Sequence, residues 1–165
     1  MVYYIGMEND VKFLVEKLKQ KKETISVMES CTGGALANAI TNVEGASNVF
    51  SFGVVTYSNE AKIKFGVSRT TIERYSVYSK ETAKEMSEAI AKFAGSTYGV
   101  GVTGMLGTVD PQNPQESNNI VYVGIFNSKT NESAVFSFMP NKGYSRRGKK
   151  TQIIDKIVAF LLKML

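Results

Sequence analysis

The sequence predicts an α/β protein, a three-layer α/β/α sandwich whose sheet is mixed and mostly parallel. Helical patterns alternate with short apolar runs in the order α-β-α-β-α-α-β-β-β-α. Strands separated by helices need crossover connections, which join parallel strands. The last two strands are separated only by a short polar segment and predict an antiparallel hairpin. The 165 residues suit one hydrophobic core, so we expect a single domain over residues 1–165.

The first half of the chain contains two predicted strands that each lead into a helix. Apolar side chains recur at helical spacing over residues 7–21, and residues 24–28 form a short apolar run that we expect to be a buried strand. Residues 49–57 are rich in aromatic and β-branched side chains and predict the second strand. Ser58 or Asn59 is expected to cap the short helix that follows.

The second half contains the longest predicted helix, over residues 80–94, with Ser79 as its cap. The inner stripe of this helix is predicted to be Ala83, Met86, Ile90 and Phe93. The other elements follow from the same patterns: a short helix at 68–75, strands at 98–103, 120–126 and 133–139, a polar loop at 105–119, a basic loop at 141–150 and a last helix at 151–163.

The chain contains no histidine, and this absence narrows the possible chemistry. It excludes Ser-His-Asp and Cys-His catalysis and disfavours a catalytic zinc site, so we expect neither a metal nor a cofactor. Proton transfer would then depend on Lys, Asp, Glu, Tyr or Cys.

The cysteine count and the charge indicate an ordinary globular protein of a reducing compartment. One cysteine cannot form an internal disulfide, and the first residues lack the pattern of a signal peptide. No run approaches the roughly 18 apolar residues of a membrane span, so we expect a cytoplasmic protein without membrane contact. The net charge of +5 favours an anionic small molecule or weak nucleic-acid contact, and it is also common in domains that bind neither.

The most informative stretch is Glu29-Ser30-Cys31-Thr32-Gly33-Gly34. It opens a predicted helix over residues 33–41, where main-chain N–H groups are unpaired and the helix dipole is positive. The two glycines permit tight backbone conformations and the close approach of a ligand. The turn therefore offers three nucleophile or donor side chains beside an oxyanion site. The alternative is an ordinary strand–helix turn capped by Thr32.

Small or polar residues mark three predicted strand ends: Ser30, Tyr57 and Thr103-Gly104. Ligands of such sheets bind beyond the carboxyl ends of the strands, so we expect these ends to converge on one crevice.

Without histidine, Lys62 is the best candidate base for Ser30. A neutral lysine is required, and the first turn of a helix together with burial would depress its pKa; the alternative is a solvated surface lysine. Tyr57 would orient the pair or relay a proton, or would simply be a half-buried strand residue. Cys31 is the rival nucleophile, because a helix N-terminus lowers the pKa of a thiol.

Four basic side chains precede the last predicted helix, and they would suit a phosphate clamp. They are Arg146, Arg147, Lys149 and Lys150. The alternatives are a solvated basic loop and a nucleic-acid patch, the latter disfavoured because few aromatic residues are interleaved with the cations.

Three segments together resemble the carboxy-terminal domain of the competence/damage-inducible protein CinA, a domain that also occurs alone as the bacterial nicotinamide-nucleotide amidase. They are residues 29–34, Gly53-Val-Val-Thr-Tyr-Ser-Asn-Glu-Ala-Lys62 and Val102-Thr-Gly104, and the likeness extends over about residues 7–165.

The resemblance implies a hydrolase that converts nicotinamide mononucleotide to nicotinic acid mononucleotide and ammonia, with the three-layer fold and homo-oligomers. It places the family's serine nucleophile on Ser30, its lysine on Lys62 and its tyrosine on Tyr57. Thr32, Gly33, Gly34 and Gly104 would supply or surround the oxyanion site beside Thr103, and Arg146 or Arg147 would hold the phosphate. The alternative is a non-catalytic nucleotide-binding or scaffolding module linked to competence or DNA damage.

The sequence departs from the family pattern in two places. Residues 105–119 replace a glycine-rich stretch and a Lys-Pro-Val-Gly segment, and Tyr144-Ser-Arg-Arg147 replaces Gly-Asp-Arg, which leaves the arginine's register open by one. Both changes concern substrate selection rather than the serine and the lysine.

Overall fold

The computed structural model describes residues 2–107, 110–114 and 119–165, with main chain alone for the first few residues. Its centre is a five-stranded sheet in the order β2-β1-β3-β4-β5. β1 pairs in parallel with β2 and β3, while β4 is antiparallel to both β3 and β5. The sheet is therefore mixed, and only β4 opposes the direction of the other strands.

The elements follow the predicted order. The strands are β1 (Ile25–Glu29), β2 (Phe50–Val55), β3 (Tyr98–Gly104), β4 (Val121–Asn127) and β5 (Glu132–Phe138). The helices are α1 (Val2–Lys21), α2 (Ala35–Thr41), α3 (Asn59–Lys64), α4 (Arg69–Tyr75), α5 (Lys80–Ala94) and α6 (Arg146–Met164), with a 3₁₀ turn at Ala46–Asn48.

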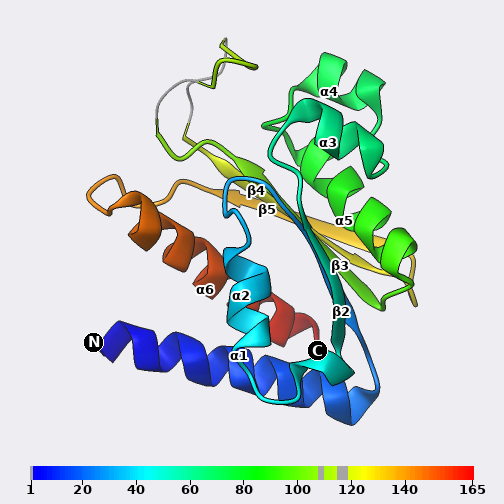
Figure 1. The fold of residues 1–165 in the computed structure, drawn as a ribbon, viewed down its shortest axis with the longest axis vertical. Helices are drawn as coiled ribbons and strands as arrows, with labels where there is room; N and C mark the ends of the chain where they lie inside the picture. Colours follow the sequence, from blue (N-terminus) through cyan, green and yellow to red (C-terminus); the bar gives the residue numbers. More distant parts are fainter. Residues whose placement is uncertain (1, 108–109, 115–118) are drawn as a thin grey trace.

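Helices cover both faces of the sheet, which confirms the three-layer α/β/α architecture. α1, α2 and α6 lie on one face, and α3, α4 and α5 lie on the other (Figure 1). The first layer buries the larger apolar cluster, which includes Leu14, Leu36 and Ile157, and the second buries a smaller one around Met28 and Met86. The chain thus satisfies both apolar faces of its central strands.

α5 packs directly onto the backbone of β3 and β4. A Cβ atom on Gly99 would lie 2.0 Å from the Ser87 carbonyl oxygen, and one on Gly124 would lie 2.3 Å from that of Ala83. These two positions therefore need glycine because of the close approach of the helix. Ser79 Oγ accepts a hydrogen bond from the Thr82 N–H, which confirms Ser79 as the cap of α5.

Several predicted boundaries and one predicted core residue were wrong. α6 begins at Arg146 rather than at 151, because Ser145 caps it by accepting from the Gly148 N–H, so the four basic residues belong to a helix and not to a loop. α2 begins at Ala35, after two glycines with positive φ.

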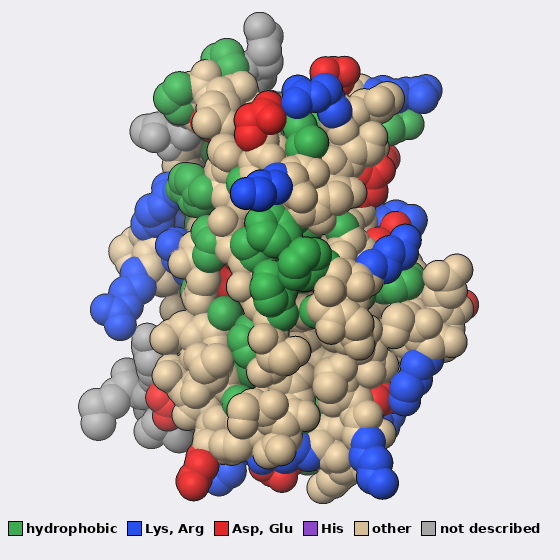
Figure 2. Space-filling view, turned by 45° about the vertical axis from the view of Figure 1, so that its right-hand side comes forward, with side chains coloured by type: hydrophobic (Ala, Val, Ile, Leu, Met, Phe, Trp, Pro, Cys, Tyr) green, Lys and Arg blue, Asp and Glu red, His purple; other side chains and the backbone are tan. Residues whose placement is uncertain are grey.

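Phe93 was predicted inside but is 61% exposed. Its ring packs 4.7 Å from that of Phe52 and 5.5 Å from that of Phe65. Phe52 belongs to β2, Phe65 directly follows α3 and Phe93 belongs to α5. Figure 2 shows hydrophobic side chains gathered on the side of the molecule that it brings forward.

In the part of the chain that the structure describes, no helix is long and apolar enough to cross a membrane.

Candidate active site

Ser30 lies immediately beyond the carboxyl end of β1, at the middle of the parallel part of the sheet. Its N–H donates to the Val102 carbonyl on β3 at 3.0 Å, and its own carbonyl accepts from the Gly33 N–H at 3.0 Å. Gly33 and Gly34 have φ of 61° and 92°, which glycine adopts readily. The side chain of Ser30 is thus fixed at the start of a tight turn and is 6% exposed.

Lys62 points from α3 into the same place. Ser58 caps α3 by accepting from the Ala61 N–H at 3.1 Å, which fixes the helix that carries the lysine. Lys62 Nζ donates to Ser30 Oγ at 3.1 Å and to the Thr56 carbonyl at 2.8 Å. The lysine side chain is 2% exposed, so this contact between two distant segments is buried.

The environment lowers the pKa of Lys62 from 10.5 to about 8. Burial is the main cause, and the nearby Cys31 and Asp110 side chains oppose it. Lys62 is the fourth residue of a six-residue helix, and burial rather than the helix N-terminus accounts for the shift. A substantial neutral fraction is therefore present just above neutral pH.

Cys31 does not have the reactive character that its position suggested. The side chain is 4% exposed, and burial raises the pKa of its thiol to about 12. Lys62 lowers this pKa, but burial outweighs that effect. The expectation of a lowered thiol pKa at a helix N-terminus was wrong.

The side chain of Glu29 binds the start of α2, a role that no local sequence pattern indicates. Its buried carboxylate accepts from the N–H groups of Gly34 and Leu36 at 3.1 Å and of Ala37 at 2.8 Å. An anion at this helix end is favourable. The N–H groups of Gly33 and Gly34, which were expected to help form an oxyanion site, are thus both already bonded within the chain.

Other donors remain near Ser30. Among the described residues, the main-chain N–H groups of Cys31 and Thr32 form no hydrogen bond to a neighbouring residue. The hydroxyls of Thr32 and Thr56 are also buried without a hydrogen-bond partner in the described part of the chain. Unsatisfied buried polar groups are uncommon, and here they border the serine and the lysine.

Thr103 and Gly104 end β3 but face the protein interior. Thr103 Oγ1 donates to the Val77 carbonyl at 2.8 Å, which engages the hydroxyl within the fold. A Cβ on Gly104 would lie 2.6 Å from the Ile120 carbonyl oxygen. The geometry explains both residues by packing, and the predicted contact with a ligand is not needed to account for them.

Tyr57 lies near the rim of the site rather than against the pair. It is 63% exposed, and its hydroxyl accepts from Arg146 Nη2 at 3.1 Å. In the described structure it has no hydrogen bond to Ser30 or to Lys62. The contact instead joins the end of β2 to the start of α6.

The start of α6 separates the two candidate arginines. Arg146 reaches Tyr57, and Lys150, one helical turn further on, places its Nζ 3.1 Å from where a Cβ of Gly33 would be. Arg147 lines a cavity of about 1030 Å³ between α1, α2 and α6, and Lys150 lines it as well. Arg146 thus contacts the tyrosine that follows β2, Lys150 lies beside Gly33 of the serine turn, and Arg147 lies on the cavity side of the helix.

A tyrosine and an aspartate that the sequence analysis did not single out complete the rim. The Tyr78 hydroxyl donates to Asp110 Oδ2 at 2.8 Å, and burial together with Asp110 raises the pKa of Tyr78. Asn59, at the start of α3, exchanges side-chain amide contacts of 3.3 and 3.4 Å with Asn113. The described part of the 105–119 loop is thereby attached to the helix that carries Lys62; the rest of that predicted loop, at 108–109 and 115–118, lies outside the described residues.

The described residues include no group of three or more metal-binding side chains that would hold a metal ion.

Fold and geometry define an α/β domain with a buried serine–lysine pair at the carboxyl edge of its sheet. The chain belongs to the CinA C-terminal domain family, whose model matches residues 8–165.

Known proteins agree with this assignment. A CinA-like protein of Endomicrobium trichonymphae is 41% identical over 153 residues, which cover 91% of this chain and 36% of that protein. A CinA-like protein of Kosmotoga olearia is 42% identical over 131 residues, covering 78% and 32%. The chain thus spans about a third of the length of these relatives.

Solved structures share the fold. A CinA superfamily protein from Escherichia coli has a TM-score of 0.81 at 27% identity, with 96% of this chain and 90% of that chain covered. A competence/damage inducible protein from Agrobacterium tumefaciens, at 22% identity, has a TM-score of 0.84 with 95% and 94% covered.

Proposed function

We propose that this domain is an amidohydrolase that acts on the carboxamide of nicotinamide mononucleotide, releasing ammonia and nicotinic acid mononucleotide. The contact between Lys62 Nζ and Ser30 Oγ, 3.1 Å long and buried, carries the proposal. A hydroxyl becomes a useful nucleophile when a neutral amine lies within hydrogen-bond reach of it. The substrate is taken from the resemblance to the nicotinamide-nucleotide amidase.

The first half of the reaction forms an acyl-enzyme. Neutral Lys62 accepts the proton of Ser30 as Oγ bonds to the carboxamide carbon, while Nζ keeps its hydrogen bond to the Thr56 carbonyl. The tetrahedral intermediate collapses as the protonated lysine passes its proton to the amide nitrogen, and ammonia leaves. In the second half, a water molecule gives a proton to Lys62 and attacks the ester, which releases the acid and restores Ser30.

Two features of the turn and of α6 assist this scheme. The N–H groups of Cys31 and Thr32 are the donors left for the oxyanion, since those of Gly33 and Gly34 are engaged. Arg146 and Lys150 offer the substrate's phosphate two cations one helical turn apart. Of the two arginines we prefer Arg146, because it contacts Tyr57 at the rim of the site, whereas Arg147 lines the cavity between α1, α2 and α6.

An ammonia-release assay with nicotinamide mononucleotide tests the proposal. We expect turnover by the unaltered protein, a loss of about 1,000-fold or more in Ser30→Ala, and no loss in Ser51→Ala, an exposed serine of β2. An active protein whose Ser30→Ala variant keeps its rate would show that the nucleophile is wrong. Binding of the nucleotide without any turnover would instead favour the non-catalytic nucleotide-binding module.

A further inference from the structure

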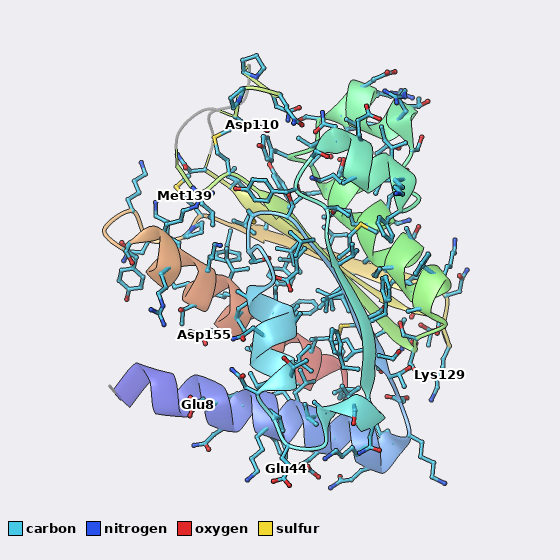
Figure 3. All side chains as sticks on the ribbon, in the orientation of Figure 1. Glu8, Glu44, Asp110, Lys129, Met139 and Asp155 are labelled. Atoms are coloured by element: carbon cyan, nitrogen blue, oxygen red, sulfur yellow. The ribbon has the colours of Figure 1, made fainter. Side chains whose placement is uncertain are left out.

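The carboxylate of Asp110 is held in a defined position at the rim of the site. It accepts hydrogen bonds from the Tyr78 hydroxyl at 2.8 Å, from the Gln112 N–H at 2.9 Å and from Asn113 Nδ2 at 2.7 Å. Burial acts to raise the pKa of Asp110, but these bonds together with the nearby Lys62 outweigh burial and lower the pKa, so that Asp110 is ionised at neutral pH. Figure 3 shows Asp110 at the top of the view, on the loop next to the helices that include α3.

The loop that carries this negative charge is bonded to the helix of Lys62. Gln112 Oε1 accepts from the Asn59 N–H at 3.4 Å and Asn113 Oδ1 accepts from Asn59 Nδ2 at 3.3 Å, and Asn59 is the first residue of α3. Asp110 and Lys62 also influence each other's pKa. The other carboxylate of the site, that of Glu29, is buried and accepts from three main-chain N–H groups. The carboxylate of Asp110 is instead partly buried and lies on the loop that is bonded to the start of α3.

The site thus has opposite charges on two sides. Arg146 and Lys150 supply cations at the start of α6, and Asp110 supplies an anion on the loop beside α3. Lys62 must be neutral to act as a base, so in the active state it has no positive charge that Asp110 would neutralise. Tyr78 adds an aromatic ring next to the anion, because its hydroxyl donates to Asp110, and aromatic faces also attract cations.

We propose that Asp110 is a specificity-determining residue, whose carboxylate pairs with a positively charged N-substituted pyridinium ring and so selects charged rings over neutral ones. This inference rests on the proposed function, and it adds a preference that the serine–lysine chemistry does not impose. The substrate's anionic phosphate would lie toward α6 and its cationic ring toward Asp110. Charge complementarity of this kind discriminates between ligands of nearly the same shape.

The test compares nicotinamide mononucleotide with its 1,4-dihydro form, which keeps the phosphate, ribose and carboxamide but lacks the ring charge. Dissociation constants would be measured by calorimetry in the Ser30→Ala background, where neither ligand is turned over. We expect Asp110→Asn to weaken the charged nucleotide about tenfold more than the neutral one. Glu60→Gln is the matched control, because Glu60 is an exposed acid of α3 that pairs with Arg69, and it should change neither constant.

Tyr78→Phe distinguishes an effect of the Asp110 charge from an effect of the position of its loop. It removes the hydrogen bond from Tyr78 to Asp110 and leaves the carboxylate in place. We expect it to weaken both nucleotides by the same factor. Equal weakening of both by Asp110→Asn, or no weakening, would overturn the inference and leave the proposed function intact. Failure of both nucleotides to bind, together with no ammonia release by the unaltered protein, would overturn the inference and the proposed function.

Discussion

Lys62 Nζ lies 3.1 Å from Ser30 Oγ, although 32 residues separate the two along the chain and they follow different strands of the sheet. Parallel pairing of β1 and β2 brings the two strand ends to the same edge. The Thr56 carbonyl then fixes the amine at 2.8 Å. The pair is consequently a product of sheet topology, and it tolerates little movement of α3.

Replacing Lys62 by Met should abolish ammonia release and stabilise the fold. A folded-state pKa of about 8 against 10.5 means that the folded protein resists protonating Lys62. The free-energy cost of keeping a charged Lys62 in the folded protein is fully present well below pH 8 and disappears as the pH rises toward 10.5. Its removal is therefore worth about 3 kcal/mol at pH 7. Denaturant unfolding at pH 7 and pH 10 would measure this gain, which should shrink at the higher pH.

Lys64→Met is the matched control for that experiment, because Lys64 is an exposed lysine of the same helix. It should change the free energy of unfolding by less than about 0.5 kcal/mol and leave turnover intact. A destabilised Lys62→Met protein would show that the lysine is a structural ion rather than a strained catalytic one.

Glu29→Gln should destabilise the protein by about 2–4 kcal/mol, because a carboxylate that accepts three main-chain N–H bonds is lost at the start of α2. Chemical denaturation would measure the change, with the exposed Glu44→Gln as control. If Glu29→Gln unfolds like the unaltered protein, the carboxylate does not hold the serine turn in place.

Arg146→Ala and Arg147→Ala should differ in their effect on the KM for nicotinamide mononucleotide. We expect a rise of about 10- to 100-fold for Arg146→Ala, since a charge-assisted bond to phosphate is lost, and a change within about twofold for Arg147→Ala. Steady-state kinetics would measure both values. The opposite order would assign the phosphate to the cavity between α1, α2 and α6.

The sequence predicted the order of the elements and the pairing of Ser30 with Lys62 well, for identifiable reasons. Alternating apolar runs and helical stripes depend on local periodicity, and the absence of histidine left few bases to choose from. Ser79 was predicted as a cap, and Ser58 as one of two candidate caps beside Asn59, because these signals lie within one turn of the helix start.

The errors concern interactions that arise only in three dimensions. Glu29 was placed in the turn that follows the strand predicted at residues 24–28, with no role of its own, and its three bonds to the start of α2 depend on how the turn folds back. Phe93 fits the inner stripe of α5 by periodicity, yet it packs sideways against Phe52 and Phe65. The contact of Tyr78 with Asp110 joins segments 32 residues apart and has no local signal.

The pH dependence of ammonia release tests the central claim, the neutral Lys62 that activates Ser30, most directly. Above about pH 7 the phosphate of the substrate is almost fully ionised, so a further change reports on the protein. Because only the neutral amine accepts a proton, kcat/KM should rise with pH and reach a plateau above about pH 8, in line with the lowered pKa of Lys62. A rate that stays constant or falls between about pH 7 and pH 9 would contradict the account.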